Sequence, residues 1–310
     1  MGRWAHHTFT AIAIASTIAI AGCGLGPRPG TSNVSLTVTR GFGSSSVAQL
    51  VESRPPGAET VMRLLERHFS LGTRYGGGFV ESINGLSGRS AHLDWFYYVN
   101  GVEASQGAAT TAVHRGDRIW WDLHYWISPQ SSPAVVGSFP EPFLHGVGGR
   151  RLPTTIECAA DTGAACKRVS SELAALGVPA ATQLIGTGSG TDSLAVVVGT
   201  WRDLRGEILS SLIEHGPAAS GVYARFSGPG GSSLRLLGPH GEPVRTLGAG
   251  AGLVAATAQG SAEPTWVITG TDPAGVSAAA AAVTPAALHD HFALAVQGAT
   301  RLALPLQGQR

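Results

Sequence analysis

Cys158 and Cys166 are the clearest pair of reactive side chains in the sequence. A short strand is predicted to end at the first, and a helix to begin near the second. In an oxidising compartment two such cysteines are expected to form a disulfide. A metal site is the alternative, but no further paired Cys or His completes one, so we predict no metal site.

Candidate catalytic residues are few. His92 and Asp94, beside an aromatic segment, are the only acid–base candidates near a plausible pocket, and a solvated loop pair is the simpler interpretation. His289 and His291 would lie on different faces of a helix, which disfavours chelation. The sequence has no Gly-x-Ser-x-Gly or His-Glu-x-x-His motif. We therefore predict no catalytic residue and no enzyme activity.

The third cysteine lies in a different setting, at the end of an apolar stretch. Residues 8–21 are apolar or small and too few to span a membrane as a helix. They lead into Ile20-Ala21-Gly22-Cys23, which resembles the bacterial lipobox, whose Cys carries a diacylglycerol. An ordinary secretory signal cleaved near Ala21, with Cys23 unmodified, is the alternative.

The lipobox resemblance implies an export route and an anchor. We expect a signal peptide over residues 1–22 and a flexible, Pro- and Gly-rich tether over residues 23–33. Acyl chains on Cys23 would hold the protein on the extracytoplasmic face of the cell membrane.

The composition limits the class of protein. Hydrophobic residues make up 43% and charged residues 13% of 310 positions, which is typical of a chain with buried cores and about two domains. The formal net charge is +1 and the basic residues do not cluster, so we expect no nucleic-acid partner.

Residues 34–128 read as one small domain with a few strands around one helix. Residues 34–39 alternate apolar and polar side chains as a half-buried strand does, and residues 60–69 have the apolar spacing of a helix. Aromatic strands are predicted over 95–99 and 118–126. This order predicts a β-grasp-like α+β fold.

Two motifs in this domain carry a family resemblance. Tyr97-Tyr98-Val99-Asn100-Gly101 is followed by Gly116-Asp117-Arg118-Ile119-Trp120-Trp121. This pair resembles the transcobalamin C-terminal-like domain family, a β-grasp module of secreted bacterial proteins. The resemblance implies the fold and, more distantly, a cobalamin-like ligand. In cobalamin carriers the related domain forms one wall of the corrin site against a helical barrel, and no such barrel is readable here.

The aromatic strands supply the candidate binding residues. One helix can cover only one face of a sheet, so we expect some of the large rings to be exposed and to contact a ligand or a partner. Packing on the helix and on the following segment is the alternative. The candidates are Trp95, Tyr97, Tyr98, Asn100, Trp120 and Trp121.

The rest of the chain is predicted to form a second domain. Residues 129–150 are rich in Pro and Gly and are expected to be a linker. Residues 151–310 alternate strand and helix signals, with buried strands at 194–198 and 265–269 and a last helix at 285–296, which predicts an α/β domain.

These observations together favour a non-enzymatic binding lipoprotein without a cofactor. Its ligand would be a small molecule, with a cobalamin-like compound as one candidate, or a partner protein such as a membrane transporter or another envelope protein. A structural or adhesive envelope protein is the second hypothesis. An envelope hydrolase acting through the α/β domain is the third.

Overall fold

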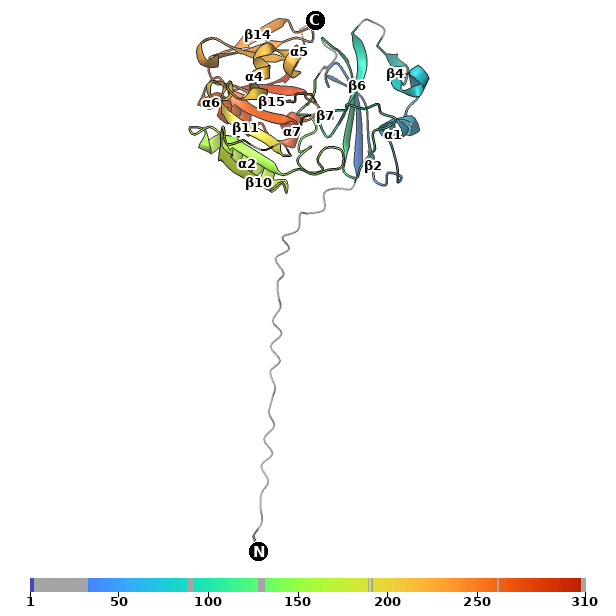
Figure 1. Ribbon diagram of the computed structural model, residues 1–310, viewed down its shortest axis with the longest axis horizontal. Coiled ribbons are helices and arrows are strands. Elements are labelled where there is room, and N and C mark those ends of the chain that lie inside the picture. The colour runs from blue at the N-terminus through green and yellow to red at the C-terminus, as the bar shows by residue number, and fades with distance from the viewer. Residues whose placement is uncertain are drawn as a thin grey trace.

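The computed structural model describes residues 1–2, 33–88, 92–127, 132–188, 190, 192–260 and 262–307. The predicted signal peptide, Cys23 and almost all of the predicted tether lie outside the described residues. Among the described residues, no helix has the length and apolar character to cross a membrane. The fold is mixed α/β and rich in strands, with several sheets and few helices. Figure 1 shows two halves side by side, which we call the first half (33–127) and the second half (132–307).

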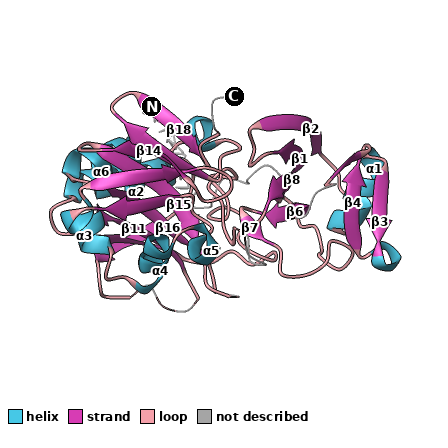
Figure 2. Ribbon diagram, turned by 90° about the horizontal axis from the view of Figure 1, so that it is seen from above, coloured by secondary structure: helices cyan, strands magenta, loops and turns pink. Residues whose placement is uncertain are grey.

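The first half is built on a five-stranded sheet in the order β2-β1-β8-β6-β7. The central strands β1 and β8 pair in parallel, and the other neighbours are antiparallel. A three-stranded sheet, β3-β4-β5, and the helix α1 complete this half (Figure 2). The elements are β1 (Val34–Arg40), β2 (Ser45–Glu52), α1 (Val61–His68), β3 (Leu71–Arg74), the short η1 (Tyr75–Gly77), β4 (Phe79–Ile83), β5 (Leu86–Ser87), β6 (Leu93–Val99), β7 (Val102–Glu103) and β8 (Arg118–Tyr125).

Both faces of the five-stranded sheet are covered. Successive side chains of a strand point to opposite faces, so each strand contributes to two cores. One face packs on the apolar side of α1, whose Val61, Leu64 and Leu65 are fully buried. The other face packs against the second half.

The second half is built on a seven-stranded sheet in the order β10-β9-β11-β16-β15-β17-β18. The strands from β10 to β16 are parallel, and those from β16 to β18 are antiparallel. The strands are β9 (Thr154–Cys158), β10 (Ala180–Leu184), β11 (Leu194–Thr200), β15 (Ala251–Thr257), β16 (Thr265–Gly270), β17 (Ala293–Gln297) and β18 (Thr300–Leu304).

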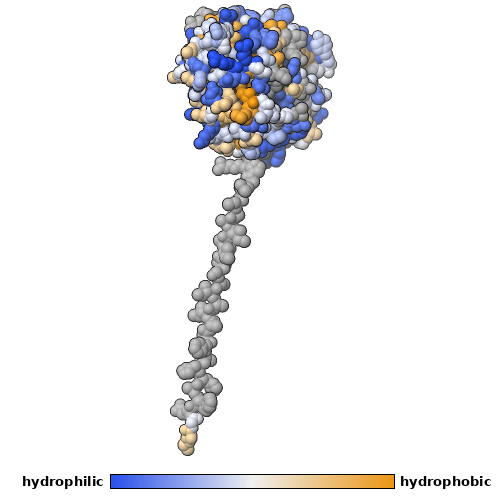
Figure 3. Space-filling view, turned by 60° about the vertical axis from the view of Figure 1, so that its left-hand side comes forward, coloured by the Kyte–Doolittle hydropathy of each residue, from blue (hydrophilic) through white to orange (hydrophobic). Residues whose placement is uncertain are grey.

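Helices and a small sheet cover this seven-stranded sheet. The helices α2 (Gly163–Ala175) and α6 (Pro273–Ala281) pack on one face. Short helices and the sheet β12-β13-β14 pack on the other. These elements are α3 (Trp201–Leu204), α4 (Ile208–Ser211), η2 (Leu212–His215), α5 (Pro217–Ser220), β12 (Ala224–Ser227), η3 (Pro229–Gly231), β13 (Ser233–Leu237) and β14 (Pro243–Leu247). On the side of the molecule drawn in Figure 3, apolar side chains form small patches among hydrophilic ones, as on ordinary protein surfaces.

The structure corrects the helix predicted at residues 285–296. The helix α7 covers only Pro285–Leu288. Asp290 has a positive φ of 56°, and the chain then enters β17. The apolar side chains of β17 are buried inside the seven-stranded sheet, so tertiary packing overrides a pattern that also suits a helix.

The predicted linker is packed rather than free where the structure describes it. Phe139 and Phe143 are buried, with ring centroids 5.5 and 5.2 Å from that of Trp266. The predicted disulfide is confirmed. It joins Cys158, at the end of β9, to Cys166 in the first turn of α2.

Candidate binding site

The six aromatic-strand candidates are all buried, each 8% exposed or less. Trp95, Tyr97 and Trp121 lie on the face that packs against α1. The rings of Tyr97 and Trp121 stack with centroids 4.8 Å apart, and the Tyr97 hydroxyl donates to the Gln106 carbonyl at 2.5 Å. These three side chains form the core of the first half.

Tyr98 and Trp120 lie on the other face, where we expected exposure. Their rings contact Phe292 of the second half, at centroid distances of 5.5 and 5.1 Å. The expectation of exposed rings is therefore wrong. The second half, and not solvent, covers the face that α1 leaves open.

Asn100 is a turn residue in this fold. Its φ is 55°, and its side-chain nitrogen donates to Asp117 and to the Gly146 carbonyl, both at 2.9 Å. Its side-chain oxygen accepts from the Arg118 N–H at 2.8 Å. These bonds tie the β6–β7 turn to the start of β8. None of the six candidates thus forms an open contact surface, and of the six only Trp120 lines the pocket described below.

Asp122 and His124 form a buried polar cluster between the halves that the sequence reasoning missed. Asp122 accepts from the N–H groups of Phe42 and Gly43, at 2.8 and 2.9 Å, and from the hydroxyl of Thr39. Its Oδ1 lies 2.9 Å from Nδ1 of His124. Two charged residue types inside an aromatic strand were the signal that could have located this cluster, because such groups are rarely buried without partners.

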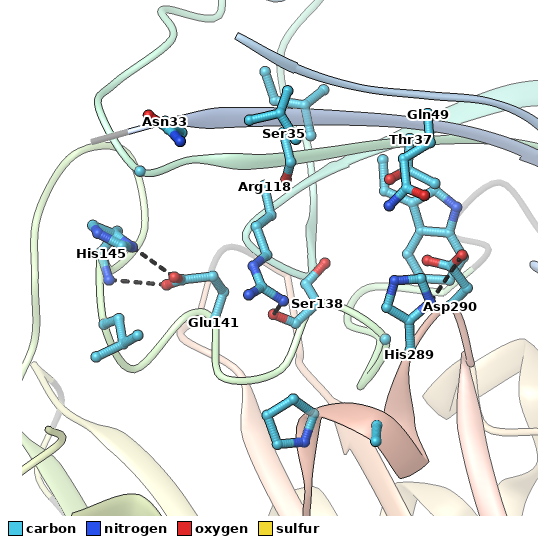
Figure 4. A pocket seen from close by; sticks show the side chains of 18 residues that line it. Asn33, Ser35, Thr37, Gln49, Arg118, Ser138, Glu141, His145, His289 and Asp290 are labelled. Carbon is cyan, nitrogen blue, oxygen red and sulfur yellow. Dashed lines mark hydrogen bonds and ion pairs between the residues drawn. The ribbon is translucent and has the colours of Figure 1, made fainter. Parts of the chain in front are cut away.

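A pocket of about 550 Å³ opens between the two halves, and Figure 4 shows it. Three segments that lie far apart in the sequence form its walls: β1 with β2 and β8, residues 137–145, and residues 285–290 around α7. The polar lining residues labelled in the figure are Asn33, Ser35, Thr37, Gln49, Arg118, Ser138, Glu141, His145, His289 and Asp290.

The first wall contains the polar side chains that alternate with apolar ones along β1. Ser35 and Thr37 face the pocket, while Val34, Leu36 and Val38 are buried in the core with α1. Ser35 and Thr37 pair in register with Arg118 and Trp120 of β8. The sequence predicted this alternation but not the wall that the polar face would form.

His145 and Glu141 form the second wall. The Nδ1 of His145 lies 2.6 Å from Oε1 of Glu141, and the backbone N–H of His145 donates to Oε2 at 2.9 Å. The hydrogen bond to Glu141 raises the pKa of His145, because it favours the charged imidazolium. The ring packs against Gly116, where a Cβ would come within 2.2 Å of it.

Arg118 extends between this pair and the third wall (Figure 4). Its guanidinium donates to the carbonyls of Phe139 and Ser138, at 2.8 and 3.3 Å. Among the described residues, no carboxylate lies within ion-pair distance of it. On the third wall, His289 Nδ1 lies 3.2 Å from Asp290 Oδ2, and burial raises the pKa of Asp290.

The predicted acid–base candidates His92 and Asp94 lie elsewhere. Asp94 accepts from the indole N–H of Trp126 at 2.7 Å, and the His92 ring lies 4.5 Å from the Trp126 ring. Neither lines the pocket. In the part of the chain that the structure describes, no three His, Cys, Asp or Glu side chains lie close enough together to hold a metal ion.

Residues 58–125 match the family described as a domain of unknown function, DUF4430. The match covers α1 through β8 and leaves the second half unassigned. No curated protein matches the chain.

Solved structures add a distant similarity. One is a protein from Ruminococcus gnavus that is provisionally described as metal binding. It is 18% identical, and the match covers 30% of this chain and 97% of that one, with a TM-score of 0.25. A similarity at that score supports no inference about fold or ligand.

Proposed function

We propose that this chain is a non-enzymatic binding lipoprotein of the bacterial cell envelope, and that the pocket between its halves binds a small molecule with a carboxylate or phosphate group. The observation that carries the proposal is Arg118, a guanidinium extended into a polar pocket with no carboxylate of its own in the described chain. Guanidinium groups recognise planar anionic groups through paired N–H donors.

The pocket chemistry supports an anionic group at one end of a polar molecule. The hydrogen bond to Glu141 raises the pKa of His145, which favours a ring that carries N–H groups on both nitrogens. Asn33, Ser35 and Gln49 add amide and hydroxyl groups that can donate hydrogen bonds. A volume of about 550 Å³ suits a small ligand.

The β-grasp relationship and the lipid anchor are parts of the same proposal. A helix packed on a mixed sheet with parallel central strands supports a β-grasp first domain. A cobalamin-like ligand is disfavoured, since the rings that would have contacted it are buried. A transporter that receives the captured molecule remains the proposed protein partner.

Isothermal titration of the full chain in detergent at low salt tests the ligand class. The probes are succinate and inorganic phosphate, with glucose as a neutral control. We expect at least one anion to bind with a Kd below about 1 mM, which corresponds to roughly −4 kcal/mol. Arg118→Gln should weaken that binding by about tenfold or more, because a charge-assisted hydrogen bond is lost.

Two further variants make the result specific to the pocket. His145→Gln, on a different wall, should also weaken anion binding. Arg235→Gln removes an equal charge from the exposed side of β13 and should not. Absence of binding by both anions, or equal binding by Arg118→Gln and Arg235→Gln, would contradict the proposal.

The β3–β4 hairpin favours an adhesive role as the second candidate function. Tyr75 is 88% exposed at its tip, and its ring lies edge-on to that of the partly exposed Phe79 at 6.4 Å. Exposed aromatic pairs on a projecting hairpin suit contact with another protein. Loss of envelope-protein crosslinking in Tyr75→Ser, with anion binding unchanged, would favour this function.

A further inference from the structure

A second cavity, of about 760 Å³, lies at another place between the halves and shares no lining residue with the first. Its walls come from the end of β6, from β7, and from residues 104–114 of the first half. The second half closes the cavity with Pro133, Val147, Gly148, Ala258, Gly260, Ala262 and Glu263.

The lining of this cavity is part apolar and part polar. The apolar lining residues are Val99, Val102, Ala104, Ala112, Pro133, Val147, Ala258 and Ala262, and the uncharged polar ones are Ser105, Gln106, Thr110 and Thr111. A ligand that removes the apolar part of this surface from water gains about 25 cal/mol for each Å² buried, so an apolar body suits the cavity.

Glu103 of β7 is one of the lining residues and is partly buried. Its carboxyl group accepts a hydrogen bond from the backbone N–H of Ser132. No basic side chain in the described chain lies within ion-pair distance of it. The other charged lining groups already have partners: Glu263 pairs with Arg150 at 3.5 Å, and His114 with Asp117 at 3.5 Å. Burial raises the pKa of Glu103 to about 7, since the charged form is poorly solvated there.

We propose that this cavity binds a small organic cation, an amine on an apolar body, with its ammonium group against the Glu103 carboxylate. The apolar walls would cover the body of the ligand, and the ammonium would supply the counter-charge that the protein does not. This site is independent of the proposed anion site, since the two pockets have no residue in common.

Cation binding at this place should release a proton. An ammonium next to Glu103 favours its ionised form, so the proton held at neutral pH passes to the buffer. Affinity should therefore rise with pH through about 7 and level off above it. The other titratable groups near Glu103 are Glu263 and His114 on the cavity wall and the buried Tyr98 hydroxyl.

The test is isothermal titration of the full chain in detergent with benzylamine, which is protonated at both pH 6 and pH 8, and with uncharged benzyl alcohol. We expect benzylamine to bind about tenfold more tightly at pH 8 than at pH 6, as the ionised fraction of Glu103 rises. Glu103→Gln should weaken benzylamine binding at pH 8 by about tenfold and remove its pH dependence. It should leave benzyl alcohol binding unchanged.

Three control variants test whether the pH dependence of benzylamine binding is due to Glu103. Glu66→Gln, on the exposed side of α1, removes the same charge elsewhere and should behave as wild type. Glu103→Asp should retain the pH dependence with weaker binding, and it provides a second variant if Glu103→Gln does not fold. His114→Gln should keep the pH dependence.

The proposal is overturned if benzylamine does not saturate the wild type by about 10 mM, roughly −2.7 kcal/mol. Equal affinity of wild type and Glu103→Gln would also overturn it. So would a pH dependence that persists in Glu103→Gln and disappears in His114→Gln.

Discussion

At the scale of single residues, the side chains with the most distinctive chemistry here have lost their access to solvent. Tyr98 and Trp120 are among the least exposed residues of the molecule, and Asn100 is consumed by turn hydrogen bonds. Arg118 lines the first pocket, together with one edge of the buried Trp120, and Glu103 lines the second. The type of a side chain therefore shows which interactions it could make, but its accessibility in the folded protein decides whether it can make them with a ligand.

Glu103 should give the unliganded protein a specific pH profile of stability. Its folded pKa of about 7 lies above the ordinary value of 4.5, so the unfolded chain loses the proton first as pH rises. The wild type should therefore lose stability between pH 4.5 and 7 relative to Glu103→Gln, by up to about 3 kcal/mol. Above pH 7 the difference should stay constant.

Urea unfolding at pH 4.5, 6 and 7.5 measures this difference. Glu66→Gln provides the matched control, because its carboxylate is exposed, and its stability difference from wild type should not follow the same curve. A flat difference between wild type and Glu103→Gln over this range would show that the carboxyl group is not desolvated in the folded chain.

At the scale of the elements, β8 connects both cores of the first half. Alternation sends Trp121 toward α1 and Trp120 toward the second half. The same alternation places Asp122 and His124 on the side of Trp120, where the β1–β2 turn closes over them. Phe42 of that turn packs against Tyr223 and Phe292 of the second half, with ring centroids 5.0 and 5.1 Å away.

Asp122 should be a main support of this turn. It accepts hydrogen bonds from Thr39, Phe42, Gly43 and His124 in a fully buried place. In Asp122→Asn, an NH2 group replaces one carboxylate oxygen and faces hydrogen-bond donors instead of acceptors. We therefore expect a loss of about 2–4 kcal/mol in the free energy of unfolding. Urea unfolding measures the loss, and the exposed Asp161→Asn is the control.

The turn itself can be observed separately. Amide hydrogen exchange at Phe42 or Gly43 should accelerate in Asp122→Asn, since the two N–H groups bond to different oxygens of Asp122 and asparagine keeps only one of them. Stability and exchange equal to those of the wild type would mean that the turn is held by the packing of Phe42 alone.

At the scale of the whole molecule, the two halves share a core and form their pockets together. The shared cluster contains Phe42, Tyr98 and Trp120 from the first half and Tyr223 and Phe292 from the second. Both candidate pockets have walls from each half. Either ligand would therefore bind across the interface, and a movement of one half against the other would change both sites.

The anchor is the whole-molecule property that the N-terminal motif predicts. When the full chain is expressed in a bacterial host fed an alkyne analogue of palmitate, the wild type should carry the label and fractionate with membranes. Cys23→Ser should lose both the label and the membrane fractionation. Cys166→Ser, which removes a cysteine of the disulfide, should keep both. Label retained in Cys23→Ser would contradict lipidation at this position.

The local pattern of residues was sufficient to predict those features of the structure that depend on near neighbours in the chain. The disulfide between Cys158 and Cys166, the helix α1 and the buried strands β11 and β16 were all predicted, because spacing and apolar periodicity determine them. The short segment at residues 285–296 was predicted wrongly. An apolar run of that length suits a helix or a buried strand equally well.

The sequence by itself thus determined the strand-rich mixed fold, the disulfide and the alternation of the aromatic strands. Only the tertiary structure decided what covers the second face of the first sheet, because that contact joins residues such as Trp120 and Phe292, which are distant in the chain. The same long-range packing buried the expected binding residues, of which only Trp120 lines a pocket, and left Arg118 and Glu103 lining the two pockets. Accessibility is a property of the assembled surface, and no local pattern of residues contains it.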